Sequence, residues 1–266
     1  MQHKLFSLLS ETSVHAGCGR SSGFVDLPFA REAATDYPVL VGSSVKGSFR
    51  DLARATWEKS QTDKVFGKQD DSGKVLISDA RLLLLPVRSM TGAYKWVTCP
   101  HLLERFSRDQ KRAGVEMQEF DLSIERYSAL AKGGGELFLE EREFKYQGSL
   151  PEGLVERLTP LLPYGPSAQR LKDQLVVLHD NDFAWFARYG LQVNARNVLD
   201  EITKESKNLW YEETLPADSL FYLTLAGRAE QDVDSLATLL NESQFVQLGG
   251  NETVGQGWFT VQEVAR

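Results

Sequence analysis

The stretch that decides the fold is residues 219–264, read as SLFYLTLAGRA (219–229), DVDSLATLLNES (232–243) and FVQLGGNETVGQGWFTVQEV (245–264). The first segment is a continuous apolar run, as in a buried strand, and the second has apolar residues at helical spacing. The third predicts a strand, a glycine loop and a last strand. The C-terminal part of the chain is therefore expected to fold as strand, helix and strand.

The N-terminal part predicts the same order. HKLFSLLSE (3–11) reads as a strand and GSSVKGSFRDLARATWEK (42–59) as one helix, and KVLISDARLLLLP (74–86), at the start of a less readable middle part that looks inserted, reads as a strand. Two strand–helix–strand units in one chain favour an α+β fold with a ferredoxin-like or RRM-like sheet. Residues 191–216 predict a polar hairpin between well-patterned elements. The remaining expectations are a strand at 94–100, a helix at 101–109, a turn at 132–136, a helical piece within 151–167 and a strand followed by a short helix within 174–190.

The segment 12–41 is unusually long for a connection between regular elements. Structureless connections above about 12 to 15 residues tend to be functional or disordered. Asp26 stands out in it, because GFVDLPFAR places one acid among apolar residues. Such a carboxylate could orient a metal ion or a hydroxyl, and it could equally be a turn or cap residue.

The expected helix 42–59 presents a basic stripe. Lys46, Arg50 and Arg54 recur every four residues, starting at the positive helix N-terminus where Ser43 or Ser44 could be the cap. The stripe could hold phosphates, or it could be an ordinary solvated helix face.

The glycine segment GGNETVGQG (249–257) permits two interpretations. Gly249, Gly250, Gly255 and Gly257 accept backbone dihedrals that bring N–H groups close to an anion, and a plain hairpin turn is the alternative. It fails as a dinucleotide fingerprint, because a strand follows it where a helix is required. GSSVKGS (42–48) likewise lacks the order of a phosphate-binding NTPase loop.

Composition restricts the remaining classes. Cys18 and Cys99 form no CxxC pair, and the four histidines show no zinc or hydrolase motif. No run of about 20 apolar residues and no signal-peptide pattern is visible, so we expect a cytoplasmic protein without a membrane partner. The net charge of −7 argues mildly against nucleic acid. However, residues 1–114 hold 17 Lys and Arg against 12 Asp and Glu, which leaves room for a basic surface.

Five segments, in this order, resemble a known family. They are SVHAGCGRSSGFVDLPFARE (13–32), VGSSVKGSFRDLAR (41–54), VVLHDNDF (176–183), NLWYEETLP (208–216) and FVQLGGNETVGQGWF (245–259). The chain is similar to the RAMP superfamily of CRISPR effector proteins, and within it to the backbone subunit of the type III-B, Cmr-type complex. Residues 60–165 contribute no firm anchor to this resemblance.

The resemblance implies a single RAMP domain with a ferredoxin-like or RRM-like palm and inserted finger-like and thumb-like lobes. The palm would comprise 1–60, about 166–190 and 216–266, the insertion about 60–165, and the thumb-like hairpin about 191–215. Expected partners are guide CRISPR RNA, complementary target RNA, further copies of the chain in a filament, other RAMP subunits, a large polymerase-like subunit and a small helical subunit.

The resemblance also implies where the chemistry lies. Asp26 matches the family's catalytic aspartate and a possible ligand of a divalent metal ion, magnesium or manganese. Target RNA would be cut once per subunit, leaving a 2′,3′-cyclic phosphate and a 5′-OH. Secondary catalytic candidates are His15, Tyr211 and Glu212, beside Glu213. Guide RNA would be held by Arg20, Ser43, Ser44, Lys46, Arg50, Gly249, Gly250, Asn251, Gly255 and Gly257.

Two alternatives stay open. The same filament subunit could hold guide RNA without cleaving, but the acid at position 26 argues for cleavage. The second alternative is a metal-independent endonuclease of the RAMP group that processes guide RNA. The thumb-like hairpin and the VDLP segment argue against this alternative.

Overall fold

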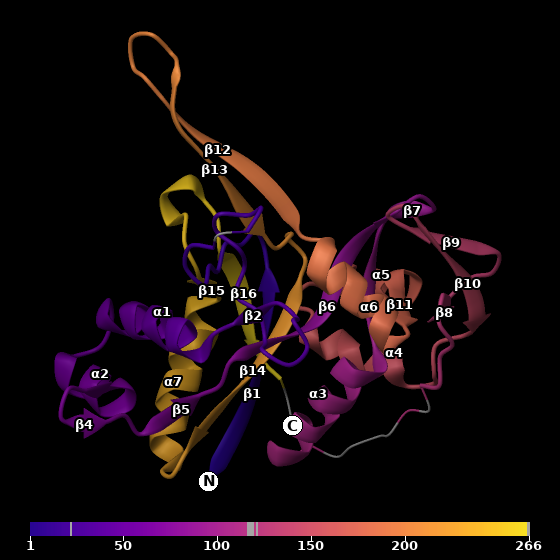
Figure 1. Ribbon diagram of the computed structural model, residues 1–266. Helices are drawn as coiled ribbons and strands as arrows, with labels where there is room; N and C mark the ends of the chain where they lie inside the picture. Colours follow the sequence, from indigo (N-terminus) through magenta and orange to yellow (C-terminus); the bar gives the residue numbers. More distant parts are fainter. Residues whose placement is uncertain (22, 116–119, 121, 265–266) are drawn as a thin grey trace.

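The computed structural model describes residues 1–21, 23–115, 120 and 122–264, and it confirms a mixed α+β architecture (Figure 1). The helices are α1 (Gly42–Arg54), α2 (Lys59–Phe66), α3 (Pro100–Arg112), α4 (Leu154–Leu158), α5 (Gly165–Gln174), α6 (Asp180–Tyr189) and α7 (Glu230–Ser243), with 3-10 turns η1 (Thr159–Leu161) and η2 (Glu252–Val254). The N-terminal strands are β1 (Gln2–Ser10), β2 (Val39–Leu40), β3 (Gly67–Lys68), β4 (Asp71–Ser72), β5 (Val75–Ile77), β6 (Ala80–Ser89) and β7 (Gly92–Thr98). The later strands are β8 (Ser128–Ala131), β9 (Glu136–Leu139), β10 (Arg142–Gly148), β11 (Leu175–Leu178), β12 (Gln192–Leu199), β13 (Ser206–Thr214), β14 (Leu220–Gly227), β15 (Phe245–Gln247) and β16 (Trp258–Glu263).

One sheet runs through the body of the molecule. Its strands follow the order β15-β16-β1-β14-β6-β7-β11-β8-β10-β9, and β5 pairs with β14 beside β6. The pairs β16–β1, β1–β14 and β14–β5 are all antiparallel. Because β6 pairs with both β14 and β7, the strands of the 60–165 segment continue the sheet formed by the two ends of the chain.

The central strand β1 is buried on both faces. Phe6 and Leu8 join the apolar core that contains residues of α1, α2 and α7, whereas Leu5 and Leu9 join a second core with residues of α3 and α4. This division follows from the two-residue side-chain period of a strand. A strand covered on both sides reads as an uninterrupted apolar run, which is why LFSLLS was recognisable in the sequence.

The helix expected at 42–59 is wrong in its length. Helix α1 ends at Arg54, and a new helix, α2, starts at Lys59. Trp57 in the break is partly buried against the core and lies 6.3 Å, centroid to centroid, from the Phe66 ring. Packing of this large ring overrides the helical propensity of the surrounding residues.

The strand expected at 74–86 is divided by Ser78 and Asp79. Asp79 Oδ1 accepts a hydrogen bond from the Gly42 backbone N–H at 2.7 Å, so this carboxylate satisfies the start of α1. The N-cap residue is Val41, and no side chain of Ser43 or Ser44 caps the helix. The serine-cap prediction is therefore wrong, because an acid 37 residues along the chain supplies the missing acceptor.

The hairpin predicted at 191–216 is confirmed as β12 paired antiparallel with β13. It projects from the body of the molecule as a narrow arm (Figure 1). Asp200 Oδ1 accepts hydrogen bonds from the backbone N–H groups of Ile202 and Thr203, both at 2.8 Å, which orders the tip. In the part of the chain that the structure describes, no helix is long and apolar enough to cross a membrane.

Candidate active site and nucleic-acid interface

The long loop 12–41 is fastened along the lower part of β13. The Leu27 N–H donates to the Tyr211 carbonyl at 3.1 Å, and the Glu213 N–H donates to the Leu27 carbonyl at 3.0 Å. Asp26 lies beside these bonds, and its Oδ2 accepts a hydrogen bond from the Tyr211 backbone N–H at 2.8 Å. The half-buried Asp26 carboxylate is thus held in a defined position although it lies in a loop.

A hollow of about 400 Å³ opens beside Asp26. Its lining residues come from the loop and from β13, and they are Arg20, Ser21, Asp26, Leu27, Asn208, Leu209, Trp210 and Glu212. The predicted residues Asp26, Glu212 and Arg20 are therefore brought together around one hollow. Trp210 and Leu209 are additions that the sequence did not single out. The hollow combines two acids, one cation and apolar surface, which suits a ligand with a phosphate and a base.

Glu212 is the buried acid of this hollow. Its Oε1 accepts from Trp210 Nε1 at 2.7 Å, its Oε2 accepts from Asn251 Nδ2 at 2.9 Å, and the Arg196 guanidinium lies 3.8 Å away. Burial acts to raise the pKa of Glu212, but these hydrogen bonds and the charges of Arg196 and His15 outweigh it, so its pKa lies below the ordinary value. Glu212 is therefore ionised at neutral pH, and its oxygens are occupied by protein donors.

His15 is buried behind the hollow. Its Nδ1 forms a hydrogen bond with the Glu213 carbonyl at 2.9 Å, and its own carbonyl accepts from the Gly250 N–H at 2.8 Å. The glycine loop passes so close that a Cβ at Gly249 would lie 2.6 Å from the His15 carbonyl oxygen. These contacts give His15 a part in shaping the loop, and its catalytic role stays a prediction from the resemblance.

The glycine loop directs its backbone donors inward. The N–H groups of Gly250, Gly255 and Gly257 donate to the carbonyls of His15, Glu252 and Ser13 respectively. The Asn251 side chain donates to Glu212 and to Gln256 Oε1, each at 2.9 Å. These donors are engaged within the protein, and an RNA-binding role of the loop stays a prediction that depends on its position next to the hollow.

The residues at Asp26 do not form an all-protein metal cage. Within the described residues there is no group of three or more His, Cys, Asp or Glu that could hold a metal ion. Magnesium, however, is commonly held by one or two carboxylates together with substrate phosphates and waters. Asp26 fits that mode, because its Oδ1 makes no hydrogen bond among those found in the described residues, while its Oδ2 is fixed by Tyr211. A metal ion would accordingly be held jointly with RNA.

Tyr211 and Glu213 both help to hold the loop that contains Asp26. The Tyr211 side chain is exposed, and its backbone N–H makes the bond to Asp26. Glu213 is buried, with Oε2 accepting from the Phe29 N–H at 2.9 Å and Oε1 paired with Arg31 NH2 at 2.7 Å. Glu213 thus anchors the stretch that follows Asp26.

The basic residues of α1 border a second hollow of about 540 Å³. Lys46 and Arg50 line it together with α2 and the β3–β4 turn, and Arg50 pairs with Asp63 at 3.0 Å. Ser43 and Ser44 are exposed at the start of α1. Arg54 does not line this hollow and lies 3.9 Å from Asp51.

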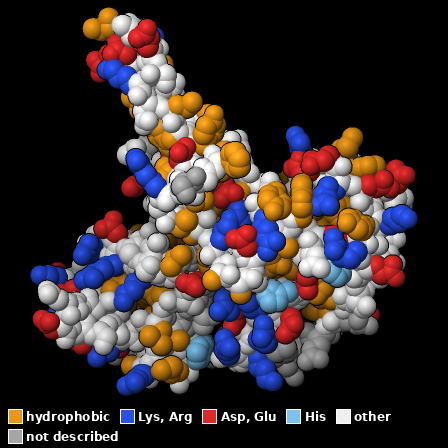
Figure 2. Space-filling view, in the orientation of Figure 1, with side chains coloured by type: hydrophobic (Ala, Val, Ile, Leu, Met, Phe, Trp, Pro, Cys, Tyr) orange, Lys and Arg blue, Asp and Glu red, His pale blue; other side chains and the backbone are white. Residues whose placement is uncertain are grey.

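Two further cations of this hollow, Lys59 and Lys68, were missed in the sequence. Figure 2 shows Lys and Arg side chains gathered over the α1–α2 region. Within residues 46–74 the sequence has seven Lys and Arg against five Asp and Glu, an excess too small to single out a site. The turn of the chain between α1 and α2 brings these cations together.

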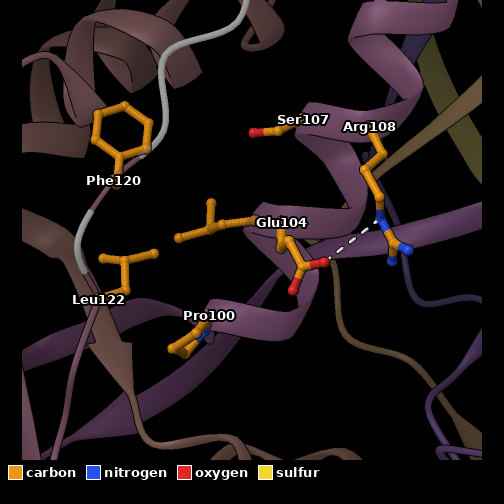
Figure 3. Close-up of a pocket in the computed structure, with 7 residues that line it drawn as sticks. Pro100, Glu104, Ser107, Arg108, Phe120 and Leu122 are labelled. Carbon is orange, nitrogen blue, oxygen red and sulfur yellow. Dashed lines mark ion pairs between the residues drawn. The ribbon is translucent and has the colours of Figure 1, made fainter.

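Another hollow of about 540 Å³ lies beside α3 (Figure 3). It is bordered by Pro100, Phe120 and Leu122, with Glu104 and Arg108 paired at 3.6 Å on the helix. None of the predicted RNA or catalytic residues lines it, so it stands apart from the candidate site.

Comparison with known proteins identifies the family. The model of the RAMP superfamily matches residues 8–260. A relative from Pyrococcus furiosus, named CRISPR system Cmr endoribonuclease Cmr4, is 30% identical over 282 aligned positions that cover 98% of this chain and 95% of the relative. The crystal structure of oligomeric Cmr4 from the same organism superposes with a TM-score of 0.79 at 28% identity, covering all of both chains. The type III-B Cmr-beta complex bound to cognate target RNA, solved by cryo-EM, contains a chain of the same fold, with a TM-score of 0.79 at 20% identity and coverage of 99% of this chain and 98% of that one. The chain belongs to the RAMP superfamily and, within it, to the Cmr4 family of type III-B CRISPR systems.

Proposed function

We propose that this chain is the backbone subunit of a type III-B effector complex, in which it holds guide RNA and cleaves complementary target RNA. The observation that carries the proposal is the Asp26 carboxylate, fixed by the Tyr211 N–H at 2.8 Å beside a hollow that also contains Arg20. The 30% identical relative is named an endoribonuclease, which supports the same activity here.

The sheet supports the proposed palm. The order β16-β1-β14-β5, all antiparallel, with α1 after β1 and α7 after β14, supports a ferredoxin-like unit, and α2 is an addition to it. In this proposal the β12–β13 arm is the thumb, and the elements between β6 and β11 form the finger-like insertion. The thumb would wedge between guide and target strands, and Ile202 at its tip is 90% exposed, as an inserted apolar side chain must be.

Guide RNA is assigned to the hollow between α1 and α2. Its lining contains four cations, Lys46, Arg50, Lys59 and Lys68, and two acids, Asp63 and Asp71. The hollow therefore has a local positive charge, although the protein as a whole is acidic. Cations of this kind bind RNA phosphates without reading sequence. Base pairing between guide and target then supplies specificity, as in other RNA-guided systems.

Cleavage is assigned to the Asp26 hollow. The ribose 2′-OH attacks the adjacent phosphorus in line and its proton passes to solvent, while the bond to the 5′ oxygen breaks and that oxygen takes a proton from solvent. The products are a 2′,3′-cyclic phosphate and a 5′-OH. Asp26 Oδ1, which makes no hydrogen bond among those found in the described residues, accepts from the 2′-OH and orients it, and Arg20 offsets the negative charge that develops on the phosphate oxygens. A divalent cation, magnesium or manganese, held by Asp26 with RNA oxygens would supply further charge stabilisation.

Assembly partners follow from the same proposal. Further copies of this chain would stack along the guide, and the similar crystal structure is of an oligomeric Cmr4. Other RAMP subunits, a large polymerase-like subunit and a small helical subunit would complete the complex.

One observation favours a second function, a guide-binding subunit that does not cleave. Asp26 accepts the Tyr211 N–H, so it already has a structural role in joining the loop to β13. A capping or bridging acid of this kind needs no chemistry to explain it.

Asp26→Asn separates the two functions. In a reconstituted complex, we expect target cleavage to fall by roughly 100-fold or more, in the range seen when an electrostatic or proton-transfer group is removed. Asparagine keeps an acceptor for the Tyr211 N–H, so assembly and target binding, measured by gel shift, should stay near wild type. Asp36→Asn is the matched control, because Asp36 is another acid of the same loop but does not line the hollow. Unchanged cleavage by a complex built wholly from Asp26→Asn subunits would leave only the non-cleaving function.

A further inference from the structure

Phe24 is the most exposed large apolar side chain of the described residues, with a relative exposure of 104%. Backbone groups on either side of it are hydrogen-bonded. The Ser21 N–H donates to the Asp26 carbonyl at 2.9 Å, and the Gly23 N–H donates to Ser21 Oγ at 3.0 Å. The phenyl ring itself faces solvent.

The chain ties Phe24 to the candidate catalytic carboxylate. Phe24 and Asp26 are two residues apart, so their Cα atoms lie within about 7 Å of each other. Asp26 is in turn fixed to β13 through Tyr211, and Leu27 is bonded to the same strand. The backbone that carries the ring is therefore within the span of one nucleotide from the backbone that carries the carboxylate.

The surroundings match the parts of a nucleotide. Arg20 in the hollow has the charge that pairs with a phosphate, Asp26 is an acceptor for a ribose hydroxyl, and Leu209, 53% exposed, and Trp210 add apolar surface on the β13 side. Aromatic rings on loops bind unpaired RNA bases by stacking, which every base permits because each has a flat face.

We propose that Phe24 is a stacking platform for one unpaired base of the target RNA, the base next to the phosphate that faces Asp26. This subsite rests on the proposed target-binding function and adds a residue to it. By holding that base out of the duplex, Phe24 would keep the neighbouring 2′-OH, phosphorus and leaving oxygen in line. It is a positioning residue whose ligand is a nucleobase of any identity.

Substitution of the ring tests the platform. Phe24→Leu keeps an apolar side chain but removes the flat ring, and we expect single-turnover cleavage at saturating target to slow by on the order of tenfold. Phe24→Trp should restore the rate, because it stacks at least as well. Tyr189→Leu, which removes an exposed ring at the end of α6, is the control. Equal rates for Phe24, Leu and Trp at this position would overturn the proposal.

The target strand offers the complementary test. Two target RNAs are made, each lacking the base on one side of the cut. One of them lacks the base that stacks on Phe24. The wild-type complex should cut that abasic target about as slowly as the Phe24→Leu complex cuts the intact target. Combining that target with Phe24→Leu should cause no further loss, because both changes delete the same interaction. If, for both abasic targets, the loss of cleavage rate from the missing base and the loss from Phe24→Leu added in full, the stacking contact would be refuted.

A readout without cleavage distinguishes failure of this subsite from failure of the proposed activity. Targets with 2-aminopurine on either side of the expected cut are bound to complexes of Asp26→Asn subunits, with Phe24 or with Phe24→Leu. Stacking on Phe24 predicts higher emission in the Phe24→Leu complex at one of the two positions. That difference supports the platform even if the wild-type complex cuts no RNA, and equal emission at both positions refutes it even if cutting is efficient.

Discussion

At the scale of single residues, Glu213 does as much for the candidate site as the residues that line it. Its carboxylate holds the Phe29 N–H with one oxygen and the Arg31 guanidinium with the other. Arg31 also donates to the Ala187 carbonyl at 2.6 Å, so α6, β13 and the loop meet at this pair. The loop that contains Asp26 is thus fastened behind the hollow by a largely buried ion pair.

We expect Glu213→Gln to destabilise the protein by about 1–3 kcal/mol, because a largely buried Arg31 loses its counter-charge. The amide oxygen can still accept from the Phe29 N–H, so the loss reports the ion pair. Urea unfolding monitored by tryptophan fluorescence measures it, and cleavage should weaken at the same time as the Asp26 loop loosens. Glu205→Gln, on the exposed hairpin, is the control. An unfolding midpoint equal to wild type would contradict the anchoring role.

At the scale of elements, the division between α1 and α2 creates the basic hollow. A single helix over 42–59 would carry Lys59 onward along the axis, about 1.5 Å per residue, away from Lys46. Instead the chain turns at Trp57, and α2 with the β3–β4 turn brings Lys59 and Lys68 to the same hollow as Lys46. The packing of one aromatic ring thereby contributes to the shape of the basic hollow.

The double variant Lys59→Ala with Lys68→Ala should weaken guide-RNA binding regardless of sequence. A plot of the logarithm of the binding constant against the logarithm of the salt concentration has a negative slope. Each lost phosphate contact on single-stranded RNA reduces its magnitude by about 0.7, so the loss of two contacts should reduce it by about 1.4. Filter binding across a salt series measures both values. Lys145→Ala with Lys172→Ala removes two exposed lysines outside the hollow and should change neither. Identical slopes for the two double variants would remove α2 from the RNA surface.

At the scale of the whole molecule, the described residues that line the Asp26 hollow come from two segments of the chain. These are the loop and β13, and the loop is bonded to β13, to α6 through Arg31 and to the glycine loop through His15. From this lining we expect a filament of such chains to have one independent site in each subunit.

Mixing subunits tests this independence. Complexes assembled from equal amounts of wild-type and Asp26→Asn chains should retain about half of the total cleavage at every cut position, with unchanged spacing between cuts, because each wild-type chain acts alone. Denaturing gels of end-labelled target measure both quantities. A much steeper loss, as from a site shared by two neighbouring chains, would contradict the one-chain site.

Features that depend on near neighbours along the chain could be predicted from the sequence. The apolar runs of β1 and β14, the periodicity of α7, the hairpin and the unusual length of the 12–41 loop were all readable, because strand and helix patterns repeat within a few residues. Asp26 could be singled out by its setting and by the family resemblance. The contacts that hold its carboxylate could not be predicted from the sequence.

Only the tertiary structure decided which distant groups meet. The partner of Asp26 lies 185 residues along the chain, and the acceptor at the start of α1 comes from Asp79, where local pattern suggested a serine. The glycine loop looked like a set of free donors, yet the N–H groups of Gly250 and Gly257 donate to the carbonyls of His15 and Ser13, and that of Gly255 donates to Glu252 within the loop. The physical reason is that a backbone N–H bonds to whichever acceptor the folded chain brings within reach, and packing of rings such as Trp57 sets that geometry.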